Sequence, residues 1–176
     1  PPEFIYQRTE SPEKSPNKCT YITIGFKNSD PVSINGAKMP PSKLLQRLNL
    51  VAGKNGIGRV DLVENRFIGI KSRGVYETPG GTVLMFAHRA IESVTLDKDT
   101  VHAKDSIMPK YAELIYNGYW FSKDRFRLQK IIDKNKKKVN GLIKLKLYKG
   151  NIILQSRQTK NKSYSVQKVS FEENNF

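Results

Sequence analysis

Alternating apolar and polar residues mark two hairpins, one toward each end of the chain. Residues 19–26, CTYITIGF, alternate in the manner of a strand and are rich in β-branched and aromatic side chains; the turn NSDP then leads to a second short strand, PVSING. Residues 139–158 place three leucines before a Lys-Gly-Asn turn and three more aliphatic residues after it. Each segment therefore predicts a pair of antiparallel strands.

Helical spacing of apolar residues dominates much of the chain between these hairpins. Pro41-Ser-Lys precedes LLQRLNLVAG, in which leucines recur at helical spacing and Gly53 is the expected C-cap. Thr78 followed by Pro79 has the form of a cap and a first-turn proline, and the apolar stripe that follows predicts a helix over about residues 80–96. Two helices with one apolar face each are therefore expected.

A longer helical stretch follows over about residues 99–117. Pro109 is expected to kink it or to begin a new segment, and Asn117-Gly118 is expected to end it. Ser122 can cap a further helix to about residue 134. The residues expected to face inward from the 99–117 stretch are Tyr111, Leu114 and Ile115. Hairpins at both ends with a central cluster of helices predict an α+β fold and argue against a doubly wound sheet.

Two segments depart from these patterns. Residues 1–19 combine several prolines with polar residues, so they are expected to form an entry arm that sustains no helix and buries little. Residues 57–73, IGRVDLVENRFIGIKSR, are extended in pattern and carry apolar residues on both parities. Both faces of this second segment are therefore expected to be partly buried.

The composition limits the classes of protein that the sequence can belong to. A length of 176 residues suits one domain with an arm. No run approaches the roughly 18 apolar residues of a membrane span, and the N-terminus lacks the basic and apolar regions of a secretory signal. Cys19, His88 and His102 form no metal-ligand motif, so the histidines are expected on the surface or capped in the core. We predict a cytoplasmic protein with no membrane partner and no metal site.

The chain is strongly basic, with 31 Lys and Arg against 16 Asp and Glu and a formal charge of +15. Such a balance permits polyanion binding, because lysine and arginine release the counterions condensed on nucleic acids. The densest basic run, residues 134–138, falls in an expected helix end and turn, where lysines are commonly solvated. The charge is therefore interpreted first as a source of solubility, and no specific nucleic-acid partner is expected.

Six charged residues lie between Arg59 and Arg73 in a segment that otherwise reads as apolar strand. Desolvating an isolated ion costs several kcal/mol, so these groups are expected to pair with one another or with a charged ligand. The segment runs on to Gly80-Gly81 at a helix start, where a carboxylate or phosphate can bind. The glycine pair can equally form a simple tight turn, and it matches no complete phosphate-loop motif. The residues alone leave these alternatives open.

A family resemblance lies in this charged segment and extends beyond it. Residues 56–81, GIGRVDLVENRFIGIKSRGVYETPGG, closely resemble the signature region of the argininosuccinate synthases. The resemblance continues through AHRAIESVTLD, PKYAELIYNGYWFS and LKLYKGN and covers about residues 20–157. It implies the fold of the family's C-terminal synthetase and oligomerisation domain. It also implies ATP-dependent ligation of citrulline and aspartate to argininosuccinate, with release of AMP and pyrophosphate, in arginine biosynthesis.

The resemblance also implies site residues. Glu64 in VENRF and Tyr76 in GVYETP match the glutamate and the tyrosine with which the family contacts citrulline. A carboxylate accepts hydrogen bonds from ammonium or ureido groups, and a tyrosine hydroxyl can donate or accept. Arg59, Arg66 and Arg73 are expected to support the pocket or to pair between subunits. No catalytic side chain is expected, because the nucleophiles belong to the substrates and the protein positions them and stabilises developing charge.

Part of the family's enzyme is absent from this sequence. The family binds ATP, with Mg, and aspartate mainly through an N-terminal half, so no cofactor and no turnover are expected from this chain alone. The expected organisation is an entry arm over 1–19, the synthetase domain over 20–157, and a truncated basic extension over 158–176 that departs from the family. A homotetramer is implied. The alternative is a noncatalytic basic domain of the same fold that binds polyanions or nucleic acid.

Overall fold

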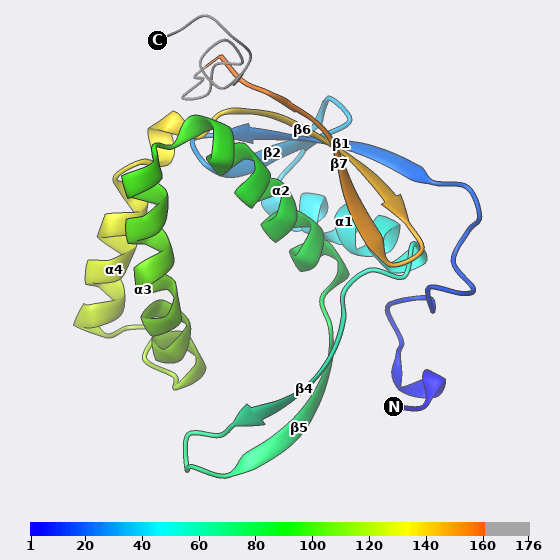
Figure 1. Cartoon of the computed structure of the whole chain (residues 1–176), viewed down its shortest axis with the longest axis horizontal. Helices are drawn as coiled ribbons and strands as arrows, with labels where there is room; N and C mark the ends of the chain where they lie inside the picture. The colour runs from blue at the N-terminus through cyan, green and yellow to red at the C-terminus, as the bar shows by residue number, and fades with distance from the viewer. Residues whose placement is uncertain (161–176) are drawn as a thin grey trace, which may run out of the picture.

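The structure is a computed structural model that describes residues 1–160, and its centre is a five-stranded antiparallel sheet in the order β3-β2-β1-β6-β7 (Figure 1). Pairing of β1 with β6 joins the two predicted hairpins, both of which are confirmed, into this single sheet. The α+β class is likewise confirmed. The strands of the sheet are β1 (Thr20–Lys27), β2 (Asp30–Ile34), β3 (Ala37–Lys38), β6 (Gly141–Tyr148) and β7 (Asn151–Gln158).

The hairpins of this sheet close with two-residue turns. Asn28 and Ser29 have φ angles of 50° and 73°, and Lys149 and Gly150 have φ angles of 44° and 80°. Left-handed conformations at both central residues belong to primed turns, whose twist matches that of the strands they connect. The turn chemistry therefore agrees with the strand pattern at both ends of the chain.

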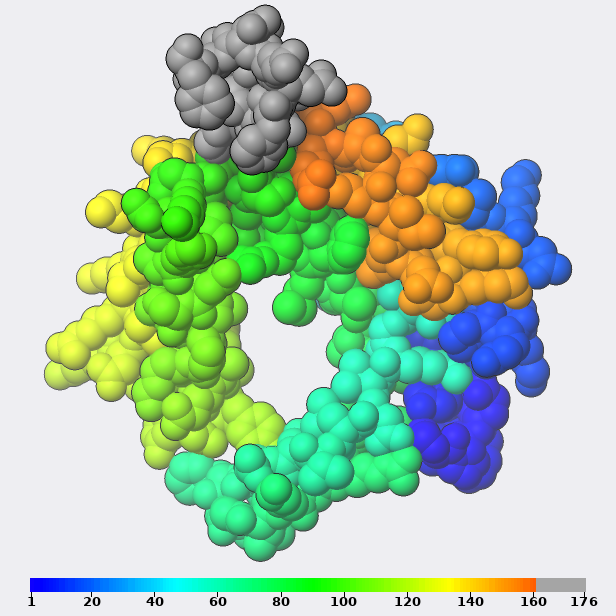
Figure 2. Space-filling model, viewed as in Figure 1, coloured from blue at the N-terminus to red at the C-terminus, as the bar shows by residue number. Residues whose placement is uncertain are grey.

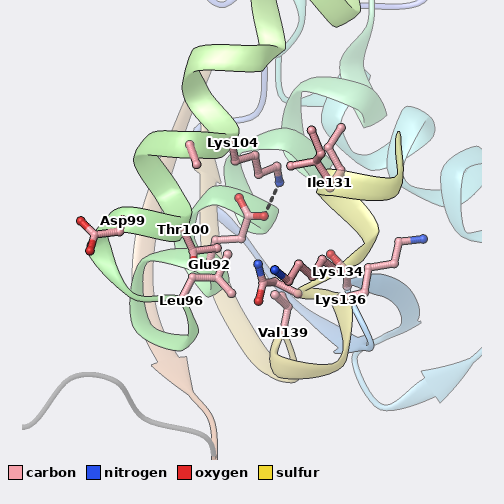
Figure 3. A pocket seen from close by; sticks show the side chains of 13 residues that line it. Glu92, Leu96, Asp99, Thr100, Lys104, Ile131, Lys134, Lys136 and Val139 are labelled. Carbon is pink, nitrogen blue, oxygen red and sulfur yellow. Dashed lines mark hydrogen bonds and ion pairs between the residues drawn. The ribbon is translucent and has the colours of Figure 1, made fainter. Parts of the chain in front are cut away.

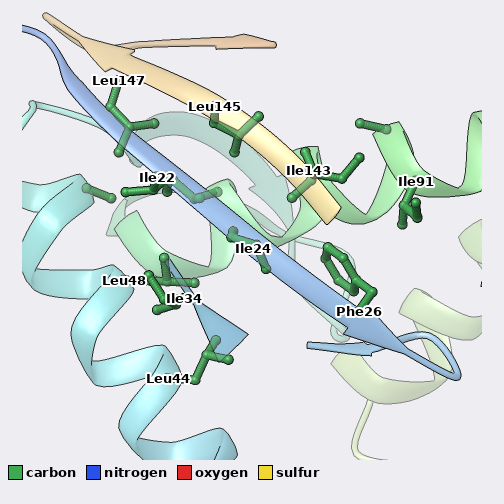
Figure 4. Packing of buried hydrophobic residues seen from close by; sticks show 14 of the residues in the cluster. Ile22, Ile24, Phe26, Ile34, Leu44, Leu48, Ile91, Ile143, Leu145 and Leu147 are labelled. Atoms are coloured by element: carbon green, nitrogen blue, oxygen red, sulfur yellow. The ribbon is translucent and has the colours of Figure 1, made fainter. Parts of the chain in front are cut away.

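Two helices, α1 (Pro41–Lys54) and α2 (Pro79–Thr95), cover one face of the sheet (Figure 4). They pack against each other and against alternate strand residues, as the predicted apolar stripes require. The buried strand residues include Ile22, Ile24 and Phe26 from β1 and Ile143, Leu145 and Leu147 from β6. The core is therefore built from the segments with the strongest sequence periodicity.

The predicted C-cap of α1 is wrong, whereas the predicted start of α2 is confirmed. Gly53 lies inside the last turn of α1, where a Cβ would come within 2.2 Å of the Arg8 carbonyl oxygen, and Asn55 is the C-cap. Thr78 is the N-cap of α2 and Pro79 is its first residue, as predicted, although the Thr78 side chain makes no capping hydrogen bond. The Gly80 N–H instead donates to Asn49 Oδ1 of α1 at 2.9 Å. The ends of these helices thus contact the arm and the neighbouring helix, and the local sequence does not indicate these contacts.

A helical hairpin of α3 (Lys98–Tyr116) and α4 (Lys123–Asp133), followed by the short η2 (Lys136–Lys138), projects from the sheet (Figure 1). Ser122 caps α4 as predicted, its hydroxyl accepting from the Arg125 N–H at 3.2 Å. α3 continues through Pro109 as one helix, so no new segment begins there. Leu114 is buried as expected, but the inward orientation predicted for Ile115 is wrong, because 41% of that residue is exposed. Within residues 1–160, no helix is long and apolar enough to cross a membrane.

A further β-hairpin, β4 (Arg59–Asn65) with β5 (Lys71–Glu77), forms a separate two-stranded sheet. It extends away from the core and, with α2 and α3, borders an opening through the molecule (Figure 2). The expectation that both faces of this segment are partly buried is wrong: Val63 is 67% exposed and Ile68 is 76% exposed. Alternating apolar residues are thus present here without a covering layer.

The N-terminal arm is more closely packed than predicted. It contains a short 3-10 helix, η1 (Glu3–Ile5), and it buries Thr9, Ser11 and Ser15. The expectation that the arm buries little is therefore wrong for these polar residues; Thr9 contacts α1 and the β4–β5 hairpin, and Ser15 lies against Gly56 just after α1. Of the predicted C-terminal extension, residues 161–176 lie outside the described residues.

Candidate functional site

Glu64 and Tyr76 share one face of the β4–β5 hairpin. The register places Val60 opposite Tyr76, Leu62 opposite Gly74 and Glu64 opposite Ser72. Because side chains alternate between the faces of a strand, these three pairs all lie on the same side. Tyr76 Oη donates a hydrogen bond of 2.6 Å to Glu64 Oε1. The structure therefore brings together the two residues predicted to contact citrulline.

Gly74 creates the space that this hydrogen bond needs. A Cβ on Gly74 would lie 2.4 Å from Cε2 and 2.8 Å from Oη of Tyr76. The tyrosine ring therefore lies across the glycine, and only a missing side chain at this register position lets the hydroxyl reach along the strand to Glu64. Gly74 was not among the residues predicted for the site, although its place between Glu64 and Tyr76 follows once β4 and β5 are paired.

The Glu64 carboxylate lies among polar partners, and its side chain is only 15% exposed. Arg66 Nη2 lies 3.3 Å from Glu64 Oε1, and Arg66 Nε donates to Ser72 Oγ at 2.6 Å. The hydrogen bond to Glu64 raises the pKa of Tyr76, with smaller contributions from burial and from the Glu64 charge. Tyr76 is thus held as a neutral donor beside a carboxylate that Arg66 also contacts.

Arg73 and Arg59 belong to the opposite face of the hairpin. Arg73 donates two hydrogen bonds to the Asp61 carboxylate, at 2.8 and 2.6 Å, and these hold the pKa of Asp61 below its usual range. Arg59 contacts the arm through Glu3, to which it donates bonds of 2.7 and 3.0 Å. Of the three arginines predicted to support the pocket, Arg66 contacts Glu64 directly, whereas the other two are engaged elsewhere within the chain.

The strand-to-helix junction at Gly80-Gly81 has fewer free hydrogen-bond donors for a carboxylate or phosphate than its sequence suggested. The Gly80 N–H already donates to Asn49, and the Glu77 carboxylate is occupied by the arm. Among residues 1–160, no three His, Cys, Asp or Glu side chains come together as a metal site. The junction therefore connects the hairpin to α2 in this structure, and its donors are not gathered around a free anion position.

Away from the hairpin, a pocket of about 290 Å³ lies between α2, α3 and the end of α4 (Figure 3). Its buried Glu92 is paired with Lys104 of α3 and lies 3.5 Å from His88 Nδ1, while His88 Nε2 lies 2.7 Å from Ser29 Oγ. Burial raises the pKa of Glu92, but His88 and Lys104 outweigh it and hold that pKa below its usual value. Lys104 pairs with Glu92 Oε1 and so connects α3 to α2, whereas the buried Glu92 Oε2 accepts no hydrogen bond from the described residues.

The whole sequence, residues 1–176, matches the family model described as "Arginosuccinate synthase C-terminal domain". The chain belongs to this family. It is 75% identical to the argininosuccinate synthase of Pelagibacter ubique over 173 residues, which are 98% of this chain and 44% of the relative. The argininosuccinate synthases of Granulibacter bethesdensis and Acidiphilium cryptum are 58% and 57% identical, each over 98% of this chain and 42% of the relative.

Membership in the argininosuccinate synthase family confirms the resemblance found in the sequence, and the chain matches the C-terminal domain of such proteins. It spans less than half the length of the curated relatives that it matches. The roles of Glu64, Tyr76 and the three arginines stay predictions. Sequence reasoning missed Gly74, Glu77 and Thr9, whose contacts depend on the register of the hairpin and on the position of the arm.

Proposed function

We propose that this chain forms the citrulline-binding part of an argininosuccinate synthase, an ATP-dependent ligase of arginine biosynthesis. The observation that carries the proposal is the 2.6 Å hydrogen bond between Tyr76 and Glu64, the two residues that match the family's citrulline contacts. Together they offer a charged acceptor and a hydroxyl on one face, which suits the ureido and ammonium groups of citrulline. The printed names of the relatives support the reaction class.

In the proposed reaction the protein side chains bind and orient, and the substrates supply the nucleophiles. The ureido oxygen of citrulline attacks the α-phosphorus of ATP, pyrophosphate leaves, and the aspartate amine then displaces AMP from the citrullyl-adenylate. Glu64 accepts hydrogen bonds from citrulline N–H groups, while the Tyr76 hydroxyl and Arg66 hold that carboxylate in place. Orienting bound reactants in this way can lower a barrier by roughly 7–11 kcal/mol.

We propose that ATP and its magnesium bind mainly outside the described residues. Within residues 1–160 no cluster of metal-ligating side chains forms, and the Gly80 N–H at the start of α2 is already bonded to Asn49. We therefore assign ATP, magnesium and aspartate to the rest of a longer protein. This chain alone is expected to release no pyrophosphate and to form no argininosuccinate.

We further propose that the full protein is a cytoplasmic homotetramer. Aromatic residues gather at the turn between α3 and α4, where Phe121 is 83% exposed and Tyr116, Tyr119 and Trp120 are each about half exposed. Clusters of exposed aromatic residues are typical of protein–protein interfaces and are uncommon on surfaces that contact only solvent. Sedimentation that showed only a monomer of the full protein at high micromolar concentration would contradict the proposed assembly.

The direct test is a chimera in which this chain replaces the matching C-terminal 44% of the Pelagibacter ubique enzyme. We expect citrulline- and aspartate-dependent formation of argininosuccinate and pyrophosphate. Glu64→Gln should lower kcat/KM for citrulline at least about tenfold, because a charged acceptor is lost from a mostly buried position. Tyr76→Phe should act in the same direction but less strongly. Glu113→Gln, at an exposed glutamate of α3, is the matched control and should change little.

An inactive chimera, or unchanged citrulline kinetics in both site variants, would contradict the proposal.

The alternative polyanion-binding function makes a different prediction, since the affinity of the chain for RNA should fall steeply as salt is added. The structure favours the ligase, because two lysines of the basic η2 segment are already paired with acids: Lys136 with Asp133 at 3.2 Å and Lys138 with Asp97 at 3.6 Å. Salt-sensitive RNA binding by this chain, together with an inactive chimera, would support the alternative.

A further inference from the structure

The β4–β5 hairpin, which carries the candidate site, has few attachments to the rest of the molecule. Its strands pair with each other and with no strand of the large sheet. At its base the Thr78 N–H donates to the Gly58 carbonyl oxygen at 2.8 Å, and Arg59 and Glu77 are partners in register. Figure 2 shows the N-terminal arm, in dark blue, against this base. The base is therefore one place at which the rest of the chain can orient the hairpin.

Glu77, the last residue of β5, is bound by three consecutive residues of the arm. Its carboxylate accepts from the Gln7 N–H at 2.8 Å, from the Arg8 N–H at 3.0 Å and from the Thr9 hydroxyl at 2.6 Å. Burial alone raises the pKa of Glu77, but these hydrogen bonds outweigh it and hold the pKa below its usual range. Glu77 thus acts as an ionised anchor for the backbone of the arm.

Arg59, the first residue of β4, is bound by the same stretch of the arm. Its guanidinium donates to both carboxylate oxygens of Glu3, at 2.7 and 3.0 Å, and lies 3.8 Å from the centre of the Tyr6 ring. Arg59 Nη2 also donates to the Thr9 carbonyl oxygen at 2.8 Å. Both strands of the hairpin are therefore fixed to residues 3–9.

The hydroxyl of Thr9 connects the two anchors. It accepts from Arg59 Nε at 2.8 Å while it donates to Glu77 Oε1 at 2.6 Å, and Thr9 is only 8% exposed. A hydroxyl can do both at once, whereas an aliphatic side chain of the same shape can do neither. An isosteric substitution of Thr9 therefore distinguishes the contribution of these hydrogen bonds from that of packing.

We propose that residues 3–9 of the arm clamp the base of the β4–β5 hairpin through Arg59 and Glu77, and that these are positioning residues for the Glu64–Tyr76 site. The relatives carry further residues outside the C-terminal domain that this chain matches. The clamp couples the orientation of the site-bearing hairpin to the position of the arm. Its consequence for catalysis rests on the proposed function, but its effect on the hairpin does not.

Hydrogen exchange of this chain tests the clamp itself. In Thr9→Val and in Glu77→Gln, amides of residues 59–77 should exchange about tenfold faster, because the hairpin opens more often at its base. Thr9→Ser keeps the hydroxyl, and Glu10→Gln changes an exposed glutamate of the same arm outside the clamp, so both should exchange at the unaltered rate. Protection of β1 and β6 should be unchanged in every variant.

Unaltered hairpin exchange in Thr9→Val and Glu77→Gln would overturn the proposal. Loss of protection in β1 and β6 in both variants would also overturn it, since the arm would then support the whole core. If Glu77→Gln alone fails to fold, the comparison of Thr9→Val with Thr9→Ser decides the matter.

Kinetics of the chimera test the positioning role. Thr9→Val should raise KM for citrulline about fivefold while KM for ATP and the melting temperature stay nearly unchanged, and Thr9→Ser should restore the citrulline value. A general loss of stability would not produce this split. An active chimera with unchanged citrulline KM in Thr9→Val would contradict the positioning role. An inactive unaltered chimera would instead contradict the proposed function, while the exchange experiment would still decide the clamp.

Discussion

In the five-stranded sheet, residues such as Ile24 and Leu145 are fully buried beneath α1 and α2, whereas the apolar Val63 and Ile68 of the β4–β5 hairpin face solvent. The first region is stabilised by removal of apolar surface from water. The second is held by directional polar contacts at its base, those of Arg59 and Glu77 with the arm. Similar strand patterns therefore carry different roles, a core in one region and a display surface for a candidate site in the other.

The largest expected difference between the regions concerns stability. Leu145→Ala should lower the free energy of unfolding by about 2–5 kcal/mol, because it leaves a cavity under α1 and α2. Val63→Ala, in the exposed hairpin, should change it by less than about 0.5 kcal/mol. Urea unfolding of this chain and of both variants measures the two values. Similar losses in the two variants would mean that the hairpin is as tightly packed as the core.

The sequence patterns predicted most of the core for a physical reason. In β1, β6, α1 and α2 the periodicity of apolar residues matches the face that is buried, so local pattern and tertiary packing agree. That the two hairpins pair through β1 and β6 was not predictable, because residues far apart in the chain, such as Thr20 and Leu147, meet there. Exposure of the β4–β5 hairpin was missed because periodicity shows which residues are apolar but not whether anything covers them.

The site was predicted in part, and by a different route. Glu64 and Tyr76 were found through the family resemblance, and the hairpin register then explains why residues twelve apart in sequence touch. The place of Gly74 was open to inference once β4 and β5 were paired, since it lies between them on the same face. The roles of Thr9 and Glu77 could not be inferred, because nothing in the composition of the arm shows that it folds back onto the hairpin.

A smaller loss of stability is expected at Glu92, a buried residue of α2 in the packed region. His88 of α2 and Lys104 of α3 face this carboxylate and hold its pKa below the ordinary value of 4.5. A lowered folded-state pKa stabilises the fold above about pH 4.5, and this contribution is lost as the pH falls below that value toward the folded-state pKa. Glu92→Gln should therefore cost about 1–2 kcal/mol at pH 7 and less near pH 3.5.

Urea unfolding at the two pH values measures this difference, and Glu113→Gln on the exposed face of α3 serves as the control with a small effect at both. A loss of stability in Glu92→Gln that is the same at pH 7 and pH 3.5 would show that shape rather than charge holds α3 to α2. The packed region would then resemble the sheet core in mechanism.

The smallest change is expected at Gly74, which lies under the Tyr76 ring in the candidate site. Gly74→Ala should raise KM for citrulline in the chimera about threefold, because the new Cβ would lie 2.4 Å from the Tyr76 ring and push the hydroxyl away from Glu64. The backbone at Gly74 is not left-handed, so alanine itself adds no strain there. Gly81→Ala is the matched control, since its Cβ would meet only the Thr78 Cβ at an ordinary 3.8 Å.

The effect expected of Gly74→Ala depends on the Tyr76 ring, and a double substitution tests that dependence. In a Tyr76→Ala background no ring lies over residue 74, so adding Gly74→Ala should leave KM for citrulline where Tyr76→Ala alone has set it. If Gly74→Ala raised KM equally in both backgrounds, displacement of the ring would be excluded as the cause. The hairpin would then act on citrulline through its backbone or overall shape, and the hydrogen bond between Tyr76 and Glu64 would lose its place at the centre of the site.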